Sequence, residues 1–559
     1  MTENAATAPF EPLSESEGDT PSNPVESAGD ALLGRIVTIS GTQIIAILNE
    51  EVCAVDGPYE LHKGELVKMI CQKGYIFGIV SGLTIPVPEN SGQNELLLAE
   101  IEMVGEITSA SGGVFRRGVS EPPSLNEPIY PTTEEDLSKV YNFEDRSVIE
   151  IGQIHQNSDR PAICSVDGML GKHFALLGST GSGKSCGVSL LLRRLSEAHP
   201  NGHIVLLDLH GEYGAAFEDI AEILTPSTMD LPYWLFNSEE ICEAISLGRR
   251  EGEHIEEALL LFKDLIVQAR KSFLKTMTSI DVPENYVTAD TPIPYAMREI
   301  LKLIDEEAGK LDKSQSLASY RWLKARIESM RADARFSFIF GGLSVRDNMA
   351  EILARLFRIP CDGKPLTIVD ISGLPSEVIN VVVSVLCRMI FDFAFWSRGM
   401  EPILLVCEEA HRYAPATRRS GEFSSGPNIL SRIAKEGRKY GISLAVVSQR
   451  PVEVDPTILS QCNTTFAFRM TNERDQDIVK GTMSETAYGL LDFLPSLGTG
   501  ECIISGEAVP VPQRVVMDIL PDHLRPRSST AAFSDSWSAQ KVESSAIPEV
   551  VHRWRRQAR

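Results

Sequence analysis

The sequence has little that points to secretion, a membrane or an oxidising compartment. Its ten cysteines, scattered from Cys53 to Cys502, include no Cys-x-x-Cys pair, which is typical of reduced thiols in the cytoplasm. The N-terminus lacks the bases and the apolar stretch of a signal peptide. The most apolar segment, 381–396, is interrupted by Arg388 and Asp392, so no segment is expected to span a membrane. We therefore expect a cytoplasmic protein without a membrane partner.

Positive charge is also scarce. Lys and Arg together number 53 against 77 Asp and Glu, a formal net charge of -24. This excludes a surface that is basic all round, as a general coat for nucleic acid or anionic lipid would be, but it leaves room for DNA held in a basic interior channel. Residues 1–30 contain seven acids, no base and one aromatic residue, Phe10, so they are expected to form a disordered acidic head.

The 559 residues, 43% of them hydrophobic, suffice for several domains with a large core. Short β-rich runs punctuated by Gly and Pro predict a small N-terminal β-barrel. Farther along, apolar strands alternate with helical stretches, which predicts an α/β fold: a RecA-like P-loop motor core with a helical insertion. The expected boundaries are 31–110 for the barrel, 111–160 for a connection, 161–233 and 341–522 for the core, 234–340 for the insertion and 523–559 for the tail.

The elements of the core can be placed more closely. Apolar runs predict strands at 173–177, 203–208, 366–370, 403–408, 442–448, 463–470, 501–505 and 512–517. In the insertion, one helical face is apolar over Ile255, Leu259, Phe262, Ile266, Ala269 and Phe273. We therefore expect a helical subdomain packed on the sheet.

A full P-loop follows the strand at 173–177 and precedes a helical stretch. It comprises Gly178, Ser179, Thr180, Gly181, Ser182, Gly183, Lys184 and Ser185. The glycines allow backbone N–H groups to surround phosphates, and the helix N-terminus adds its positive dipole end. Lys184 is expected to reach the β- and γ-phosphates and Ser185 to ligate Mg²⁺. The sequence lacks the Asn-Lys-x-Asp signature of GTP-binding proteins, so ATP is the expected nucleotide.

Two acids end the strand at 403–408. Glu408 is expected to hold the magnesium shell, and Glu409 to polarise the attacking water as general base. P-loop motors more often carry Asp at the first position. A strand that simply ends in solvated acids is the alternative, but a P-loop in the same chain makes the catalytic interpretation stronger.

Polar residues at other strand ends are further candidates. Asp208 and Glu212 follow the second strand, where they could bind the magnesium shell or orient water, although Asp208 could instead only cap the next turn. Gln449, directly after 442–448, is placed to sense the γ-phosphate, or it is a buried amide with satisfied hydrogen bonds.

A basic cluster precedes the strand at 442–448. It comprises Arg432, Lys435, Arg438 and Lys439. An arginine finger from a neighbouring subunit would explain one of them, and Arg438 is the stronger candidate. The alternative is a solvated helix face, which suits at least two of the four.

Four segments together resemble the HerA branch of the HerA/FtsK superfamily. They are Gly-Ser-Thr-Gly-Ser-Gly-Lys-Ser, Asp-Leu-His-Gly-Glu-Tyr, Glu-Glu-Ala-His-Arg-Tyr and Glu-Gly-Arg-Lys-Tyr-Gly…Ser-Gln-Arg-Pro. The N-terminal β-rich segment is similar to the HAS-barrel of that branch, and the resemblance covers about residues 33–522.

The resemblance implies a homo-hexameric ring that hydrolyses ATP at subunit interfaces and moves double-stranded DNA through a central pore. It also implies a partner, either a NurA-type nuclease in DNA end processing or a defence effector. A Gly/Ser/Pro-containing loop after the Glu408–Glu409 pair carries Arg412, Arg418 and Arg419, which could contact DNA phosphates or belong to an ordinary mobile loop. A nucleotide-gated scaffold for a partner effector and a secretion or conjugation motor are the alternative functions.

Overall fold

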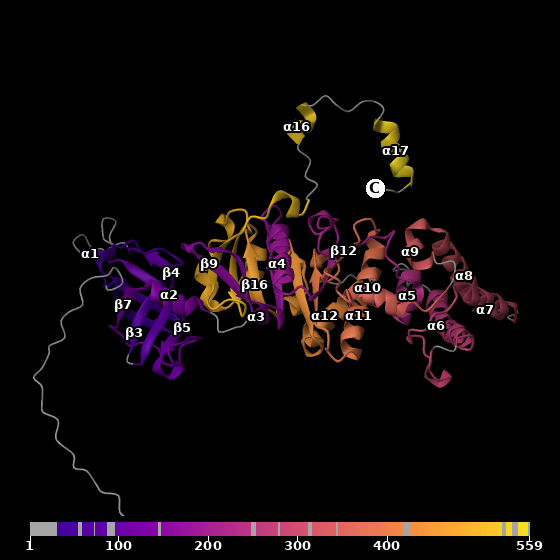
Figure 1. Cartoon of the computed structure of the whole chain (residues 1–559), viewed down its shortest axis with the longest axis horizontal. Coiled ribbons are helices and arrows are strands. Elements are labelled where there is room, and N and C mark those ends of the chain that lie inside the picture. Colours follow the sequence, from indigo (N-terminus) through magenta and orange to yellow (C-terminus); the bar gives the residue numbers. More distant parts are fainter. Residues whose placement is uncertain are drawn as a thin grey trace, which may run out of the picture.

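A computed structural model describes residues 31–527 and two C-terminal helices, α16 (Phe533–Ser538) and α17 (Ala546–Arg556). Within 31–527 the description omits 54–58, 72, 87–95, 143–146, 247–252, 278–279, 311–315, 342–344 and 418–424. The expected acidic head therefore lies outside the described residues. Figure 1 shows a barrel and a group of helices at opposite ends of a large sheet.

The N-terminal domain is a closed barrel of six strands with a seventh at its edge. In order around the barrel they are β2 (Gln43–Leu48), β1 (Gly34–Ser40), β7 (Pro128–Pro131), β3 (Leu66–Cys71), β4 (Gly74–Thr84) and β5 (Leu98–Thr108), with β6 (Phe115–Arg117) beside β5. Pairing of β2 with β5 closes the ring. Along β2 the side chains of Ile44, Ala46 and Leu48 are buried and alternate with partly exposed ones, as expected for one face turned inward.

Two strands of the barrel domain lie in the segment 111–160, which the sequence predicted to be a connection. β6 and β7 lie beyond residue 110, and β7 pairs with both β1 and β3. A short helix, α1 (Glu50–Cys53), lies between barrel strands, and α2 (Glu134–Tyr141) follows the barrel. The Arg117 guanidinium of β6 donates to the carbonyls of Pro510 (2.9 Å) and Gly506 (2.7 Å), which ties the barrel to the core.

The core is built on one eleven-stranded mixed sheet. Its order is β12 (Ala221–Leu224), β13 (Leu366–Asp370), β11 (His203–Asp208), β14 (Ile403–Cys407), β15 (Ile442–Ser448), β10 (His173–Leu177), β16 (Cys462–Phe468), β17 (Glu501–Gly506), β18 (Gln513–Met517), β8 (Val148–Ile154) and β9 (Asn157–Ser165). The strands from β12 to β16 pair in parallel and the others antiparallel. This is the α/β P-loop fold with a preceding barrel that the sequence predicted.

Helices cover both faces of the central strands. Every residue of β10, β14 and β15 is buried, which explains why these strands read as continuous apolar runs rather than as alternating patterns. Alternate residues enter two separate hydrophobic clusters, one beneath α4 (Lys184–Ala198) and one beneath α11 (Ser376–Trp396) and α12 (Ser425–Glu436). The remaining core helices are α3 (Val166–Leu170), α13 (Pro456–Leu459), α14 (Glu473–Thr482) and α15 (Tyr488–Leu491).

The segment between β12 and β13 is helical. It contains α5 (Ser238–Ser246), α6 (Glu253–Leu274), α7 (Met297–Lys310), α8 (Ser316–Ala332), α9 (Ser337–Phe340) and α10 (Met349–Phe357). The apolar face predicted for α6 is turned inward: Phe262, Ile266 and Ala269 are 0–2% exposed. Burial of this face holds α6 against α8 and α7.

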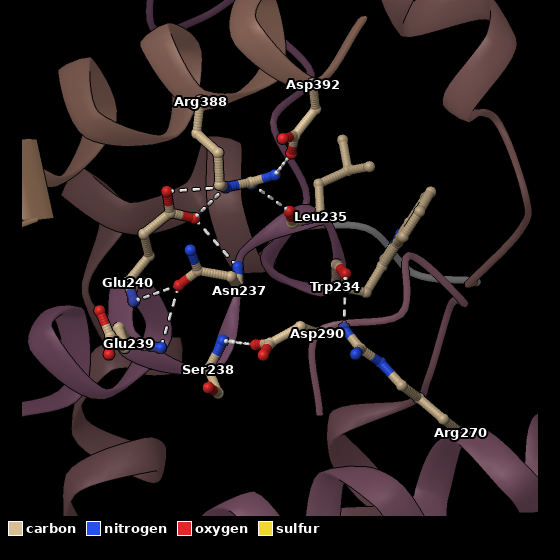
Figure 2. Close-up of polar contacts among 10 residues, drawn as sticks. All are labelled: Trp234, Leu235, Asn237, Ser238, Glu239, Glu240, Arg270, Asp290, Arg388 and Asp392. Atoms are coloured by element: carbon tan, nitrogen blue, oxygen red, sulfur yellow. Dashed lines mark hydrogen bonds and ion pairs between the residues drawn. The ribbon is translucent and has the colours of Figure 1, made fainter. Parts of the chain in front are cut away.

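A buried ion pair joins this insertion to the core (Figure 2). Arg388 of α11 binds both carboxylate oxygens of Glu240 on α5, at 2.8 and 3.0 Å, and donates to the carbonyl of Leu235 at 2.7 Å. A fourth contact, at 2.9 Å, reaches Asp392 one turn farther along α11. The Glu240 side chain is only 1% exposed, and its burial raises the pKa of Glu240 although Arg388 opposes the shift. The buried carboxylate of Glu240 in the insertion is therefore compensated by the guanidinium of Arg388 on α11.

Removing one partner of this pair should destabilise the fold strongly. We expect Arg388→Met to lower the free energy of unfolding by about 3–5 kcal/mol, because Glu240 is left as an uncompensated buried charge. Urea denaturation followed by circular dichroism measures the change. The double variant Arg388→Met/Glu240→Leu is the matched control and should recover much of the loss. A single variant within about 1 kcal/mol of wild type would contradict this role.

Helix α11 contains the most apolar segment of the sequence, 381–396, which was not expected to span a membrane. Its stretch Val378–Trp396 has a mean hydropathy of 2.0 and is long and apolar enough, and it is the one such helix in the part of the chain that the structure describes. However, 72% of that stretch is buried inside the fold, and the two charges that interrupt it are paired as described above. Its apolar character is that of a core helix covering a parallel sheet.

Candidate nucleotide-binding site

The P-loop lies between β10 and α4, at the carboxyl edge of the parallel strands. Gly181 and Gly183 have φ angles of 73° and 98°, in the left-handed region that favours glycine. A side chain at Gly183 would also lie 2.6 Å from the backbone nitrogen of Gly500, so only glycine fits. The loop is fixed by its neighbours: the Ser179 N–H donates to the Arg469 carbonyl (3.0 Å) and the Gly500 N–H to that of Ser182 (3.0 Å).

Three of the predicted residues meet at this loop. Lys184 Nζ lies 3.8 Å from Glu409 Oε1, and both side chains are nearly inaccessible, at 4% and 3% exposed. The Gln449 amide donates to Glu409 Oε1, and its carbonyl oxygen accepts from the Thr180 hydroxyl. β14 and β15 are neighbours in parallel register, which brings Glu409 and Gln449 to the same edge as the P-loop. This arrangement places a buried carboxylate beside a lysine and an amide at the loop where the sequence predicts that nucleotide phosphates bind.

Glu409 has a strained backbone. Its φ of 48° puts a non-glycine residue in the left-handed region, between β14 and the short 3₁₀ turn Ala410–Arg412. Such conformations cost of order 1–3 kcal/mol and persist where the surroundings fix them. Here the Gln449 amide and the nearby Lys184 fix the Oε1 side of the carboxylate. His411 Nδ1 lies 3.2 Å from Oε2, but that oxygen is buried and accepts no hydrogen bond from the described residues. The strain aims the carboxylate into the site.

Glu408 occupies a separate position that is also buried. The Tyr213 hydroxyl donates to Glu408 Oε1 at 3.0 Å and also interacts with Ser185, so it links the two residues expected to hold magnesium. Burial raises the pKa of Glu408 well above its usual range, and the nearby Asp208 adds to the shift. Glu408 Oε2 is buried and accepts no hydrogen bond from the described residues. This oxygen, together with the Ser185 hydroxyl, fits a hydrated magnesium ion.

The structure gives Asp208 the capping role that was the alternative interpretation. Its two carboxylate oxygens accept from four backbone N–H groups, those of His210, Gly211, Glu212 and Tyr213, at 2.8–3.3 Å. These bonds fold the segment after β11 so that Tyr213 points into the site. Glu212 is half-buried, which raises its pKa, and it interacts electrostatically with Lys184. A role for either carboxylate toward the nucleotide stays a prediction.

Arg438 lies far from the P-loop of its own chain. Its side chain is exposed in the turn Gly437–Tyr440, at the amino end of β15, whereas the P-loop follows the carboxyl end of β10. The two strands are parallel, so the length of β15, roughly 20 Å at 3.3 Å per residue, separates them. Within one chain Arg438 cannot serve the site, and only a neighbouring subunit could use it there. Arg432 instead packs over the Phe391 ring at 4.2 Å.

The DNA-binding prediction is only partly covered by the structure. Arg412 is exposed, one turn after Glu409, while Arg418 and Arg419 lie outside the described residues. Sequence reasoning missed Tyr213 and His411 as site residues. Tyr213 follows Asp208 and His411 follows Glu409 in motifs that the sequence analysis recognised. Their place in the site depends on contacts between residues of different strands, which the motifs do not show. His411 also reaches Ser448 Oγ at 3.2 Å, which connects the end of β15 to Glu409.

Comparison with known proteins shows which proteins the chain resembles. Residues 149–390 match the family model described as helicase HerA, central domain. The DNA double-strand break repair helicase HerA of Pyrococcus furiosus is 26% identical over 473 residues, covering 76% of this chain and 78% of that protein. The HerA of Sulfolobus acidocaldarius is 28% identical over 445 residues, covering 77% and 79%.

Solved structures with related folds are more distant. The VirB4 structure of Thermoanaerobacter pseudethanolicus aligns with a TM-score of 0.47 at 15% identity, covering 69% of this chain and all of that one. The bacterial conjugative coupling protein TrwB aligns with a TM-score of 0.44 at 14% identity, covering 71% and 93%. The HerA family match spans the P-loop and the insertion, and the similarity to HerA proteins extends over three quarters of the chain. The chain is therefore a HerA-like P-loop ATPase, similar to the HerA helicases.

Proposed function

We propose that this protein forms a homo-hexameric ring in the cytoplasm that couples ATP hydrolysis to movement along double-stranded DNA held in a central pore. The observation that carries the proposal is that the residues predicted to hydrolyse ATP lie at two opposite edges of the sheet. Lys184, Glu409 and Gln449 meet at the P-loop, while Arg438 is exposed at the opposite edge. A ring in which each subunit presents Arg438 to its neighbour completes every site. The named function of the HerA relatives supports DNA as the substrate.

The residues have distinct roles in this proposal. The P-loop backbone and Lys184 bind the phosphates. Glu409 accepts a proton from the attacking water as the bond from the water oxygen to the γ-phosphorus forms and the bond from that phosphorus to the bridging oxygen breaks, so that ADP and inorganic phosphate are the products. Gln449 holds one oxygen of the Glu409 carboxylate, and the other oxygen, Oε2, is left without a hydrogen bond from the described residues and is the one to accept the proton from that water. When bound by Ser185 and Glu408, Mg²⁺ neutralises phosphate charge. Arg438 of the adjacent subunit stabilises the charge that develops on the γ-phosphoryl group.

The link from hydrolysis to DNA would run through the segment after Glu409. Arg412 follows the general base by three residues, and the segment with Arg418 and Arg419 continues from it. Phosphate contacts from these arginines would carry no sequence preference, as a motor requires. A change in the conformation of Glu409 during hydrolysis would therefore need to move only a short segment of the chain to shift the residues that contact DNA. We propose that this motor serves a partner nuclease in DNA end processing or an effector in phage defence.

The test is the rate of ATP hydrolysis by the purified protein with and without linear duplex DNA. We expect duplex DNA to raise the rate at least several-fold, with Glu409→Gln as the background control. Hydrolysis that is robust but indifferent to duplex would contradict the translocase and favour a scaffold ring or a secretion motor. Triple alanine substitution of Arg412, Arg418 and Arg419 should abolish the stimulation while it leaves the basal rate in place.

A further inference from the structure

Tyr213 is a buried tyrosine whose hydroxyl lies between the two residues expected to hold magnesium. Its side chain is 0% exposed, and its hydroxyl donates to Glu408 Oε1 at 3.0 Å. The same phenol oxygen interacts with the hydroxyl of Ser185. A polar group that water cannot reach is committed to the partners around it. The hydroxyl of Tyr213 therefore has a defined place between Ser185 and Glu408.

The backbone and the ring of Tyr213 are both held in place. Its N–H donates to Asp208 Oδ2 at 3.0 Å, and its carbonyl accepts from the Ala216 N–H at 2.9 Å. Asp208 is itself fully buried and accepts three further backbone N–H groups from the same segment. The ring belongs to the hydrophobic cluster beneath α4. The hydroxyl is therefore presented to Glu408 by a segment with little freedom to move.

The number of available protons sets the direction of each hydrogen bond. A tyrosine hydroxyl has one proton, and that of Tyr213 is used by Glu408 Oε1. Toward Ser185 the phenol oxygen can therefore only accept, so the Ser185 hydroxyl turns its proton to Tyr213. This leaves the lone pairs of Ser185 available, as well as Glu408 Oε2, which accepts no hydrogen bond from the part of the chain that the structure describes. Oxygen lone pairs of this kind are what Mg²⁺ binds.

We propose that Tyr213 is a positioning residue that prepares Ser185 and Glu408 to bind Mg²⁺. The proposal rests on the ATP site of the function proposed above and specifies how that site is oriented. P-loop motors more often carry Asp where this chain has Glu408, and the longer glutamate has one more rotatable bond. The hydrogen bond from Tyr213 fixes that extra freedom. Partners that do not touch the metal orient its ligands in this way in many metal sites.

The test removes only the hydroxyl of Tyr213 from the full-length protein. We expect Tyr213→Phe to raise by about 10–100-fold the Mg²⁺ concentration needed for half of the Mg²⁺-dependent gain in nucleotide affinity, the usual effect of losing a partner that orients a metal ligand. Equilibrium binding of a fluorescent, non-hydrolysable ATP analogue over a Mg²⁺ series measures this without hydrolysis. In EDTA the affinity for the analogue should equal that of wild type, because the P-loop backbone and Lys184 still bind the phosphates.

Tyr233→Phe is the matched control. Tyr233 is also buried, and its hydroxyl likewise donates one hydrogen bond, to the Tyr295 carbonyl (2.8 Å), and accepts another, from the Met297 N–H (2.9 Å). These contacts lie in the segment between β12 and β13, so the control should lose stability as a buried hydroxyl is removed and keep the wild-type dependence on Mg²⁺. Thermal unfolding of both variants separates the cost in stability from an effect on the metal.

The outcomes separate this proposal from the one on which it rests. A folded Tyr213→Phe protein with the wild-type dependence on Mg²⁺ overturns the positioning role, and so does an equal shift in Tyr233→Phe, because the effect is then one of general stability. A wild-type protein whose nucleotide affinity does not respond to Mg²⁺ overturns the magnesium site and the role of Tyr213 together. A shift confined to Tyr213→Phe supports the role even where duplex DNA fails to stimulate hydrolysis, a result that contradicts the translocase alone. Should Tyr213→Phe fail to fold, Tyr213→Met, which lacks the hydroxyl and fills irregular core space, decides the question by the same titration.

Discussion

Replacement of Glu409 by Gln should reduce the rate of ATP hydrolysis by about 10²–10⁴-fold and leave nucleotide binding in place. The amide keeps the size of the side chain but cannot accept a proton from the attacking water, and this range is typical of a lost general base. Binding should persist because the P-loop backbone and Lys184, not Glu409, contact the phosphates. Removal of the carboxylate 3.8 Å from Lys184 Nζ also leaves that lysine free to turn fully to the nucleotide.

Turnover and binding must be measured on the same protein to test this. Phosphate release gives the rate, and equilibrium binding of a fluorescent ATP analogue gives the affinity. Lys184→Ala should lose binding itself, which distinguishes a phosphate-binding residue from a base. Glu306→Gln, an identical chemical change at an exposed acid on α7, should behave as wild type. A Glu409→Gln enzyme with wild-type turnover, or one that no longer binds nucleotide, would contradict the assignment.

Much of the core could be predicted from the sequence because its strands are buried on both faces. Runs such as His173–Leu177 and Ile442–Ser448 are continuous and apolar, bounded by polar residues, and the structure places strands at those positions. Parallel strands put their carboxyl ends on one edge, so the meeting of Lys184, Glu409 and Gln449 follows from the pattern alone. The barrel strand β7 was missed for the opposite reason. It has four residues with a proline at each end, and its partners β1 and β3 are distant in sequence.

The missing parts of the site depend on packing that no local pattern contains. Tyr213 is fully buried between Ser185 and Glu408 because Asp208 folds the segment before it. The sequence could show Asp208 as a cap or as a ligand, and only the four N–H groups around its carboxylate decide between them. His411 likewise contacts Glu409 through the left-handed backbone of that residue, a conformation that side-chain periodicity does not predict.

Substitution of Arg438 by Ala should lower hydrolysis by about 10³–10⁵-fold, the effect of losing an arginine finger, although every P-loop remains intact. The reason is geometric. Arg438 stands at the amino edge of β15 and is exposed, so its charge reaches a γ-phosphate only in a neighbouring subunit. Unlike Lys184→Ala, the variant should bind ATP normally.

Mixing two inactive variants distinguishes action between subunits from a local defect. An Arg438→Ala subunit has a complete P-loop, and a Lys184→Ala subunit has an intact arginine. Mixed rings therefore contain some interfaces that combine the wild-type P-loop of an Arg438→Ala subunit with the wild-type arginine of a Lys184→Ala subunit. These interfaces should hydrolyse ATP, although neither variant does so alone. Lys439→Ala, which removes an exposed base from the same turn, should keep its activity and so control for the loss of charge. Full activity of Arg438→Ala alone would contradict the assignment of Arg438 to the site. So would the absence of hydrolysis in every mixture of variants that assembles into rings. Arg432 or Lys435, on the same edge, would then be the candidate for the stabilising charge.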